Sequence, residues 1–330
     1  MVRSDRFTSL LGNKAMKTVT RLDAVERGNP VIATIGAFDG VHRGHQFLIR
    51  QVVERARCLD FDSLVLTFDP SPAVVLRPGS LQLTGAREKA RIIGAVGPDV
   101  LAILPFSPQL AEGPAGQFLA SIIDRVNLSE IWVGSDFAFG HKREGNVDFL
   151  IRAAERLCFA VHIVPRQRLQ ETPISSTLVR EMVVAGDMEG AARFLGHYVS
   201  LKGTVVAGFG RGTQMGVPTA NVRPPSSQLL PAIGVYAAYL RVDSQQLPAA
   251  VSVGYNVVFA GTEVSVEAHV LDFDGDLRDR EVAIDFVARI LDEEKFESVE
   301  ALVAQMHRDI ETVRRVLAVA EEPGELLLAP

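Results

Sequence analysis

The chain has 330 residues, 47% of them hydrophobic, and a formal net charge of −6 at pH 7. A single hydrophobic core rarely grows beyond roughly 250 to 300 residues, so we expect two domains. The negative charge and the lack of a basic run argue against a nucleic acid partner, which would require a cationic surface.

The same inspection argues against a membrane protein and a disulfide-bonded one. No apolar run approaches the roughly 18 residues of a membrane span, and no leader precedes the first strand, so we expect a cytosolic protein without a membrane partner. Residues 1–15, which precede Met16, are expected to be an unstructured extension. Cys58 and Cys158 lie in apolar helical patterns and are expected to be inert core thiols.

The first half of the chain alternates strand-like and helix-like segments. Apolar runs are followed by helical segments such as Gln117 to Val126 and Asp148 to Leu157. This alternation predicts crossover units and a doubly wound parallel sheet that is covered on both faces. The apolar runs are Val31 to Ile35, Leu64 to Phe68, Val100 to Leu104, Ile131 to Val133 and Ala160 to Val164.

The segment TIGAFDGVHRGHQFLIRQVVERA, residues 34–56, predicts a strand end, a glycine-containing turn and an amphipathic helix. The free N–H groups and the positive dipole end of that helix favour an anion. His42 and His45 lie three residues apart at the helix entrance, where imidazoles can donate to phosphate oxygens. The pattern suggests nucleotidyl transfer; the alternative is a pair of solvated capping histidines.

Two later segments of this half carry polar or aromatic groups near element ends. In ISSTLVR, a guanidinium beside two hydroxyls at a helix start suits phosphate oxygens, although Ser175 or Ser176 can equally cap the helix. In VGSDFAFG, Asp136 follows a strand. The neighbouring Phe137 and Phe139 either stack on a base or flavin ring or belong to the core.

Beyond Tyr198 the pattern changes to short alternating stretches followed by a helix that contains Val299 and Leu317. Five or six such strands predict a small closed antiparallel barrel. The segment TLVREMVVAGDMEGAARFLG predicts a helical connector before it. We expect one domain over residues 16–190 and a second over 191–325.

The second half contains a glycine-rich loop and an acidic strand. In GFGRGTQMGVPTAN, Gly212 and Gly216 would let backbone amides approach phosphate, and the loop leads into Asn221. Thr219 could bind Mg²⁺ beside nucleotide oxygens, although glycine-rich runs are most often ordinary loops. In VSVEAHVLDF, Glu267 and His269 share the strand face opposite the valines, which is either a solvated face or a functional one.

Seven motifs occur in an order that resembles the prokaryotic bifunctional riboflavin kinase/FAD synthetases, over about residues 31–318. They are GAFDGVHRGH, TFDPSP at 67–72, VGSDFAFG at 133–140, ISSTLVR at 174–180, GVPTAN at 216–221, GVY at 234–236 and VEAHVLDF at 266–273. The resemblance implies an HxGH nucleotidyltransferase domain followed by a riboflavin-kinase barrel. The chain would then phosphorylate riboflavin to FMN and transfer the adenylyl group of ATP to FMN, with Mg²⁺, to give FAD and pyrophosphate.

The resemblance also implies site residues. His42 and His45 would contact the ATP phosphates, and Glu267 would accept the proton of the ribityl 5′-hydroxyl. Thr219 would bind Mg²⁺. The implied nucleotide- or flavin-binding residues are Gly36, Phe38, Asp39, Gly44, Asp136, Phe137, Ser176, Thr177, Arg180, Gly212, Gly216 and Asn221. The implied partners are therefore flavins and ATP, and self-association is left open.

The sequence departs from the family pattern at several positions. Ser71 replaces a histidine, and the kinase half differs at Tyr255 to Phe259, Arg278, Asp279 and Leu291. These differences leave two alternatives to a bifunctional enzyme. One is an FMN or related nucleotidyltransferase whose kinase domain is degenerate, and the other is a flavin- or nucleotide-binding regulator without turnover.

Overall fold

The computed structural model describes residues 16–208, 216–258, 261–292, 297–321 and 323–324. Contacts between residues divide the chain into two compact units. The first unit comprises residues 16–38, His45–Leu76 and Lys89–Arg166. The second comprises Asp39–Gly44, Arg77–Glu88 and the chain from Gln167 onward. Two short segments from the first half of the sequence thus belong to the second unit.

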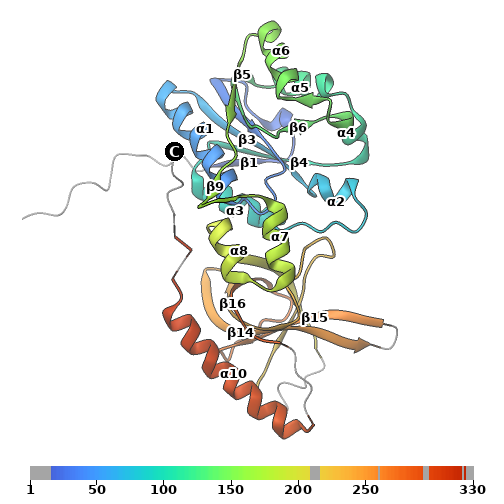
Figure 1. The fold of residues 1–330 in the computed structure, drawn as a ribbon, viewed down its shortest axis with the longest axis vertical. Coiled ribbons are helices and arrows are strands. Elements are labelled where there is room, and N and C mark those ends of the chain that lie inside the picture. Colours follow the sequence, from blue (N-terminus) through green and yellow to red (C-terminus); the bar gives the residue numbers. More distant parts are fainter. Residues whose placement is uncertain (1–15, 209–215, 259–260, 293–296, 322, 325–330) are drawn as a thin grey trace, which may run out of the picture. The chain divides into compact units, whose positions relative to one another are not determined.

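The first unit is built on a parallel sheet of six strands (Figure 1). Its strand order is β1-β4-β3-β2-β5-β8, which confirms the expected doubly wound class. The strands are β1 (Lys17–Val19), β2 (Pro30–Ile35), β3 (Asp62–Asp69), β4 (Val100–Pro105), β5 (Asn127–Gly134) and β8 (Ala160–Val164).

Strand β2 shows how the sequence buries both faces of this sheet. Ile32 packs with the helix α1 (Arg43–Leu59) on one face, where Val52 and Ala56 are fully buried. Its neighbour Val31 belongs to the cluster on the opposite face. Because successive strand residues point to opposite sides, a continuous apolar run serves helices on both faces. The remaining helices are η1 (Leu22–Ala24), α2 (Pro72–Leu76), α3 (Ala86–Val96), α4 (Pro108–Glu112), α5 (Ala115–Ile123), η2 (His141–Arg143) and α6 (Val147–Leu157).

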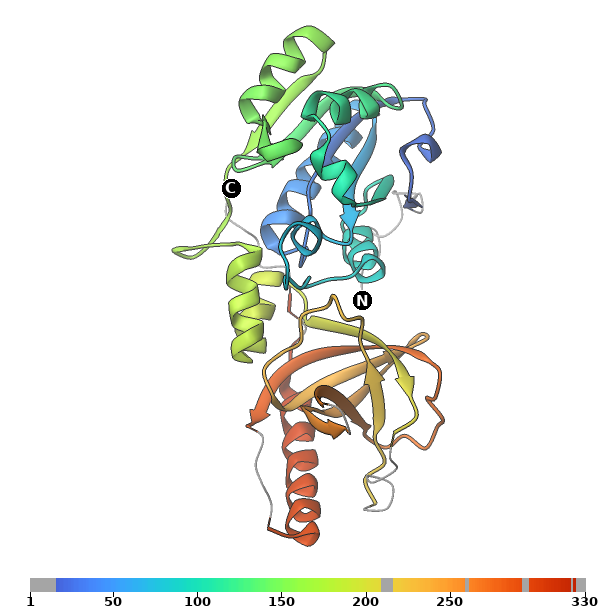
Figure 2. The same cartoon turned by 90° about the vertical axis from the view of Figure 1, so that its right-hand side faces the viewer.

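The second unit contains a closed antiparallel barrel (Figure 2). Its strands, in the order in which they pair, are β11 (Val199–Val206), β12 (Ala220–Arg223), β15 (Gly261–Val270), β14 (Gln245–Val258), β13 (Gly234–Val242) and β16 (Glu281–Leu291). Tyr236 and Phe286 are fully buried inside it and meet edge to face at 5.2 Å. The expected barrel of five or six strands is confirmed.

Three helices accompany the barrel. α7 (Ser176–Ala185) and α8 (Met188–Leu195) form the expected connector and are separated at Gly186, whose φ of 81° is left-handed. Met188 and Leu195 belong to the barrel core. α10 (Val299–Val319) packs Val313 against the outer face of the barrel, as the apolar spacing predicts. Short two-stranded ribbons pair β6 (Ala138–Phe139) with β7 (Gly145–Asn146) and β9 (Arg168–Leu169) with β10 (Thr172–Pro173).

Some sequence expectations are corrected or fall outside the described residues. Cys58 and Cys158 are free thiols but both are exposed, so the expectation of core thiols was wrong. Cys58 lies near the end of α1, and Cys158 is the left-handed residue that ends α6, where the chain leaves the core. Residues 1–15, Gly212 and Phe259 lie outside the described residues. In the part of the chain that the structure describes, no helix could span a membrane.

A buried carboxylate on β5 organises one edge of the first unit. The side chain of Glu130 accepts hydrogen bonds from Arg55 at 2.8 Å and from the indole of Trp132 at 2.9 Å, and His162 Nε2 lies 3.2 Å away. Burial by itself would raise the pKa of Glu130. The hydrogen bonds from Arg55 and Trp132 and the charge of His162 outweigh it, so the pKa is lowered overall.

This lowered pKa predicts an acid-dependent contribution to stability. A carboxylate with a lowered folded-state pKa stabilises the fold above its ordinary value of 4.5, and the contribution is lost as pH falls through the folded-state pKa. Glu130→Gln should therefore flatten the decline of the unfolding free energy below about pH 4.5. Urea unfolding followed by the fluorescence of Trp132, the only tryptophan, measures this. The exposed Glu155→Gln is the control. The prediction would be contradicted if the unfolding free energy of both variants fell in the same way below about pH 4.5.

Candidate active sites

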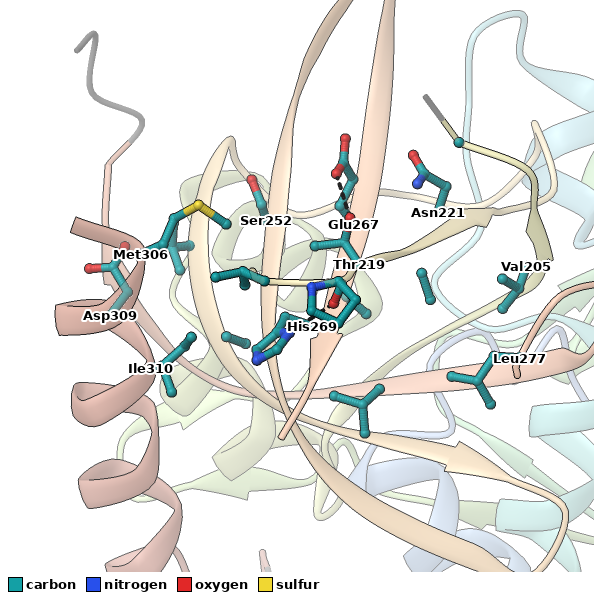
Figure 3. Close-up of a pocket in the computed structure, with 18 of the residues that line it drawn as sticks. Val205, Thr219, Asn221, Ser252, Glu267, His269, Leu277, Met306, Asp309 and Ile310 are labelled. Carbon is teal, nitrogen blue, oxygen red and sulfur yellow. Dashed lines mark hydrogen bonds between the residues drawn. The ribbon is translucent and has the colours of Figure 1, made fainter. Parts of the chain in front are cut away.

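The barrel and α10 together line a cavity of about 770 Å³ in the second unit. Residues of all six barrel strands, of α10 and of the chain that follows β15 contribute to its wall. Val205 and Leu277 supply apolar wall, and Met306 and Ile310 do so from α10 (Figure 3). A volume of this size, mostly apolar with a few polar groups, is typical of a small-molecule site.

Strand pairing brings three polar side chains together in this cavity. Glu267 on β15 lies directly opposite Asn221 on β12 and opposite Ser252 on β14. Directly paired residues of antiparallel strands have side chains on the same side of the sheet, and all three line the cavity. Thr219 also lines it, and its hydroxyl donates a hydrogen bond to Glu267 Oε2 at 3.1 Å (Figure 3). The structure thus places together three residues that the sequence marked separately: Thr219, Asn221 and Glu267.

His269 connects the same strand to the loop before β12. Its Nδ1 lies 2.8 Å from the carbonyl oxygen of Pro218 (Figure 3). Because a carbonyl only accepts, Nδ1 donates, which fixes the tautomer of the neutral ring. The bond holds the backbone immediately before Thr219. The sequence grouped His269 with Glu267 on one face but gave His269 no role.

The family departures have different settings in the barrel. Leu291 lines the cavity, whereas Tyr255 is 53% exposed. Arg278 also lines it and donates to both carboxylate oxygens of Asp276. The side-chain and backbone hydrogen bonds of Arg278 lower the pKa of Asp276 to about 2.

The side chain of Asn221 packs against Gly208 beside the cavity, in space that a Cβ at position 208 would occupy. A Cβ added at Gly208 would lie 2.1 Å from the Asn221 amide nitrogen and 2.7 Å from its Cγ. Real Cβ atoms do not approach other heavy atoms this closely, so Asn221 would have to move.

For the riboflavin kinase that the sequence resemblance implies, Gly208→Ala should lower the rate of phosphorylation by roughly tenfold or more, since one hydrogen bond to a charged group contributes ~1.5–3 kcal/mol. Adenylyl transfer to supplied FMN should persist. The control is Gly85→Ala in the same unit, whose added Cβ would meet nothing closer than 3.8 Å. Unchanged phosphorylation in Gly208→Ala would show that Asn221 is not needed there.

The chain that follows β2 carries the other candidate residues, which belong partly to the first unit and partly to the second. In the first unit, the buried Phe38 has a left-handed φ of 44°. A Cβ added at Gly36 would lie 2.7 Å from the Phe38 ring, so this buried ring would have to move to make room for a larger residue at position 36. The Phe38 ring also meets His45 edge to face at 5.1 Å. His45 lies in the first turn of α1, as predicted.

In the second unit, Asp39 joins three segments that are distant in sequence. Its Oδ1 accepts hydrogen bonds from the backbone N–H groups of Leu83 at 3.0 Å and Thr84 at 3.2 Å. Its other oxygen is paired with Arg180, and the Ser176 hydroxyl donates to its carbonyl at 2.8 Å. The structure thus brings together Asp39, Ser176 and Arg180. Thr177 is exposed on the same helix, and the cap of that helix is Ser175.

The turn that contains His42 is held from α8 and the residues after it. His42 is buried, and a Cβ at Gly44 would touch its ring at 3.3 Å. His197 Nε2 lies 3.0 Å from the carbonyl oxygen of Gly40, whose φ is 80°. Val41 is also left-handed, with a φ of 39°. Non-glycine residues adopt this conformation where surrounding contacts impose it, often in functional turns.

The aromatic residues near Asp136 pack with one another. Phe137 stacks on Phe139 at 5.3 Å, and Phe139 meets Phe149 at 5.9 Å. Both phenylalanines are partly buried and pack against the core of the first unit. Asp136 is exposed. Both rings are partly buried, so the core interpretation accounts for the packing of both.

Comparisons with known proteins show the family to which the chain is similar. The FAD synthetase family model matches residues 25–178, and the riboflavin kinase family model matches residues 195–317. The bifunctional riboflavin kinase/FMN adenylyltransferase of Listeria monocytogenes is 35% identical over 298 residues, which cover 89% of this chain and 94% of the relative. The protein of the same description from Pseudomonas fluorescens is 35% identical over 291 residues, which cover 87% and 93%.

A solved structure is similar over nearly the whole chain. It belongs to a Streptococcus pneumoniae protein described as a macrolide-efflux protein, with 32% sequence identity and a TM-score of 0.80. The match covers 91% of this chain and 99% of that one.

Proposed function

Because the chain belongs to the family of bifunctional riboflavin kinase/FMN adenylyltransferases, we propose that its two reactions are divided between residues 16–190 and 191–325. It is a transferase with both a FAD synthetase and a riboflavin kinase domain. In this division the first segment adenylylates FMN and the second phosphorylates riboflavin. The two family matches, to residues 25–178 and 195–317, support it.

The kinase proposal depends chiefly on the position of Glu267 in the barrel cavity. Riboflavin would place its ribityl 5′-hydroxyl at this carboxylate. The hydroxyl oxygen attacks the γ-phosphorus of ATP, its proton passes to Glu267, and ADP leaves, giving FMN. The apolar wall from Met306 and Ile310 suits an aromatic ring system.

The oxygen groups beside Glu267 fit Mg²⁺. The Thr219 hydroxyl and the carboxylate are 3.1 Å apart, and the amide of Asn221 lies on the adjacent strand. Among the described residues no group of three His, Cys, Asp or Glu side chains could hold a metal ion. Mg²⁺ commonly binds through one or two protein oxygens together with waters and substrate phosphates. Thr219 would hold it, and when bound the ion would neutralise phosphate charge.

For adenylyl transfer, we assign His42 and His45 to the ATP phosphates. An oxygen of the FMN 5′-phosphate attacks the α-phosphorus of ATP, and pyrophosphate leaves, so no residue needs to form a covalent bond. The N-terminus of α1 and the two imidazoles would stabilise the developing charge. Ser176, Thr177 and Arg180 would bind the triphosphate, with Arg180 shared between it and Asp39. Gly36, Phe38, Asp39 and Gly44 would shape the turn, and Asp136 and Phe137 would lie at the ring of the nucleotide or flavin.

The direct test is incubation of the protein with riboflavin, ATP and Mg²⁺, followed by chromatographic separation of riboflavin, FMN and FAD. We expect FMN and FAD to appear in sequence. FAD from supplied FMN without any FMN from riboflavin would favour the single-activity alternative, and neither product would favour the regulator. We also propose a cytoplasmic location, where ATP is supplied.

His45→Ala should reduce FAD formation from FMN by about a hundredfold and leave riboflavin phosphorylation intact. Removal of one preorganised donor costs on the order of 3 kcal/mol in the transition state. The initial rates of both half-reactions, measured on the same preparation, provide the check and its internal control. Full FAD synthesis in this variant would exclude the assignment.

Glu267→Gln keeps the size and hydrogen-bonding capacity of the side chain but cannot take the ribityl proton. FMN formation from riboflavin should therefore fall, whereas FAD formation from supplied FMN should persist. Stopped assays of each half-reaction separate these effects. A glutamine variant that phosphorylates riboflavin at the wild-type rate would remove Glu267 from the mechanism.

A further inference from the structure

Lys89, in the first turn of α3, is a fully buried lysine in the first unit. Its ammonium donates to the carbonyl oxygens of Ala37 and Phe68, each at 2.9 Å, and lies 3.5 Å from the Thr67 hydroxyl. An ammonium has three hydrogens to donate, and these three oxygens lie within 3.5 Å of it. Lysine is almost never fully buried unless such partners are present.

The two carbonyls lie where β2 and β3 stop pairing. The ladder between these parallel strands ends with Gly36 N–H donating to Leu66 O at 3.0 Å. Carbonyls alternate sides along a strand, so Phe68 O points to the same side as Leu66 O. In a longer ladder a β2 amide would occupy that place. Here the chain turns away after Ala37, and the Lys89 ammonium donates to the Phe68 carbonyl oxygen in place of that amide.

The Ala37 carbonyl receives a second bond that strengthens this junction. The Thr67 hydroxyl donates to it at 3.0 Å. Lys89, Thr67 and the two carbonyls therefore tie the residue before Phe38 to the end of β3. Thr67 and Phe68 are the first two residues of the TFDPSP motif, which continues with Asp69.

The free-energy cost of burying the Lys89 ammonium argues for a specific role. Removing an ammonium from water costs several kcal/mol, and well-packed apolar side chains are often as stabilising as the buried charge they replace. An apolar residue of similar length would fill the space under the sheet. Only a long side chain that ends in a donor can form hydrogen bonds to both carbonyl oxygens at the ends of these neighbouring strands.

We propose that Lys89 is a positioning residue for adenylyl transfer, holding the backbone on both sides of the β2–β3 junction in its reactive arrangement. This inference rests on the proposed function. Lys89 is fully buried, so we place its role in the backbone that it holds. It fixes Ala37 and thereby the left-handed Phe38, whose ring packs on Gly36 and meets His45 at 5.1 Å. Loss of the ammonium would let this turn relax and move the His45 imidazole.

The first experiment is Lys89→Met, which keeps the length of the side chain and removes its donors. FAD formation from FMN should fall by roughly a hundredfold, mainly in kcat, because small misplacements of catalytic groups have effects of this size. Riboflavin phosphorylation, which uses the barrel cavity, should be unchanged. The control is Lys17→Met, which removes a half-exposed lysine of the same unit. Loss of both activities in Lys89→Met would overturn the proposal by showing a general role in folding.

The second experiment separates the charged donor from packing. Lys89→Ala removes the chain from Cγ to the ammonium, which corresponds to propylammonium. Adenylyl transfer by this variant should recover with added propylammonium and not with 1-propanol, which fills the same space without the charge. Equal recovery with both compounds, or with neither, would overturn the proposal.

The wild-type enzyme distinguishes this inference from the proposed function. If wild-type protein makes no FAD from FMN, the proposed function fails. If it makes FAD and Lys89→Met does so at the same rate, only the role of Lys89 fails.

Discussion

The second unit depends on the buried carboxylate of Asp39. Its partners are the amides of Leu83 and Thr84 and the guanidinium of Arg180, and a buried carboxylate persists only where it is paired and hydrogen-bonded in this way. These partners come from two stretches that are distant from Asp39 in sequence, so one side chain ties together the turn after β2, the segment Arg77–Glu88 and helix α7. Each compact unit of this protein is therefore built from several separate stretches of the chain.

The segment Arg77–Glu88 is also bound to the barrel by charged groups. Glu88 is 2% exposed and lies 2.9 Å from Arg241 and 3.6 Å from Lys202, and Arg241 also pairs with Asp285. Burial lowers the pKa of Lys202 even though Glu88 opposes it. For Arg241, burial acts in the same direction, but Asp285 and Glu88 raise its pKa overall. Breaking such a buried cluster by removing one partner is costly, so it favours a single arrangement of the segment.

The two units fix their functional groups by different means. In the barrel, strand register places Asn221 and Ser252 on either side of Glu267, so the backbone ladder itself aligns the polar groups. After β2 the ladder ends, and side chains hold the backbone instead, with Lys89 on the Ala37 carbonyl in the first unit and Arg180 on Asp39 in the second. A turn held by polar side chains can adopt left-handed residues such as Phe38, which a regular strand cannot.

The sequence by itself determined the elements and the chemical classes. Local periodicity predicted the five main parallel strands, the barrel, the connector and the final helix, and motif spacing indicated the family and the candidate residues from His42 to Glu267. It could not show that Thr219 bonds Glu267, that Arg180 pairs with Asp39 or that Lys89 is buried, because those contacts join residues 21 to 141 positions apart. It also misplaced both cysteines, since an apolar pattern does not tell which helix end leaves the core. Such contacts depend on strand register and on the packing of distant segments, and only the tertiary structure decides them.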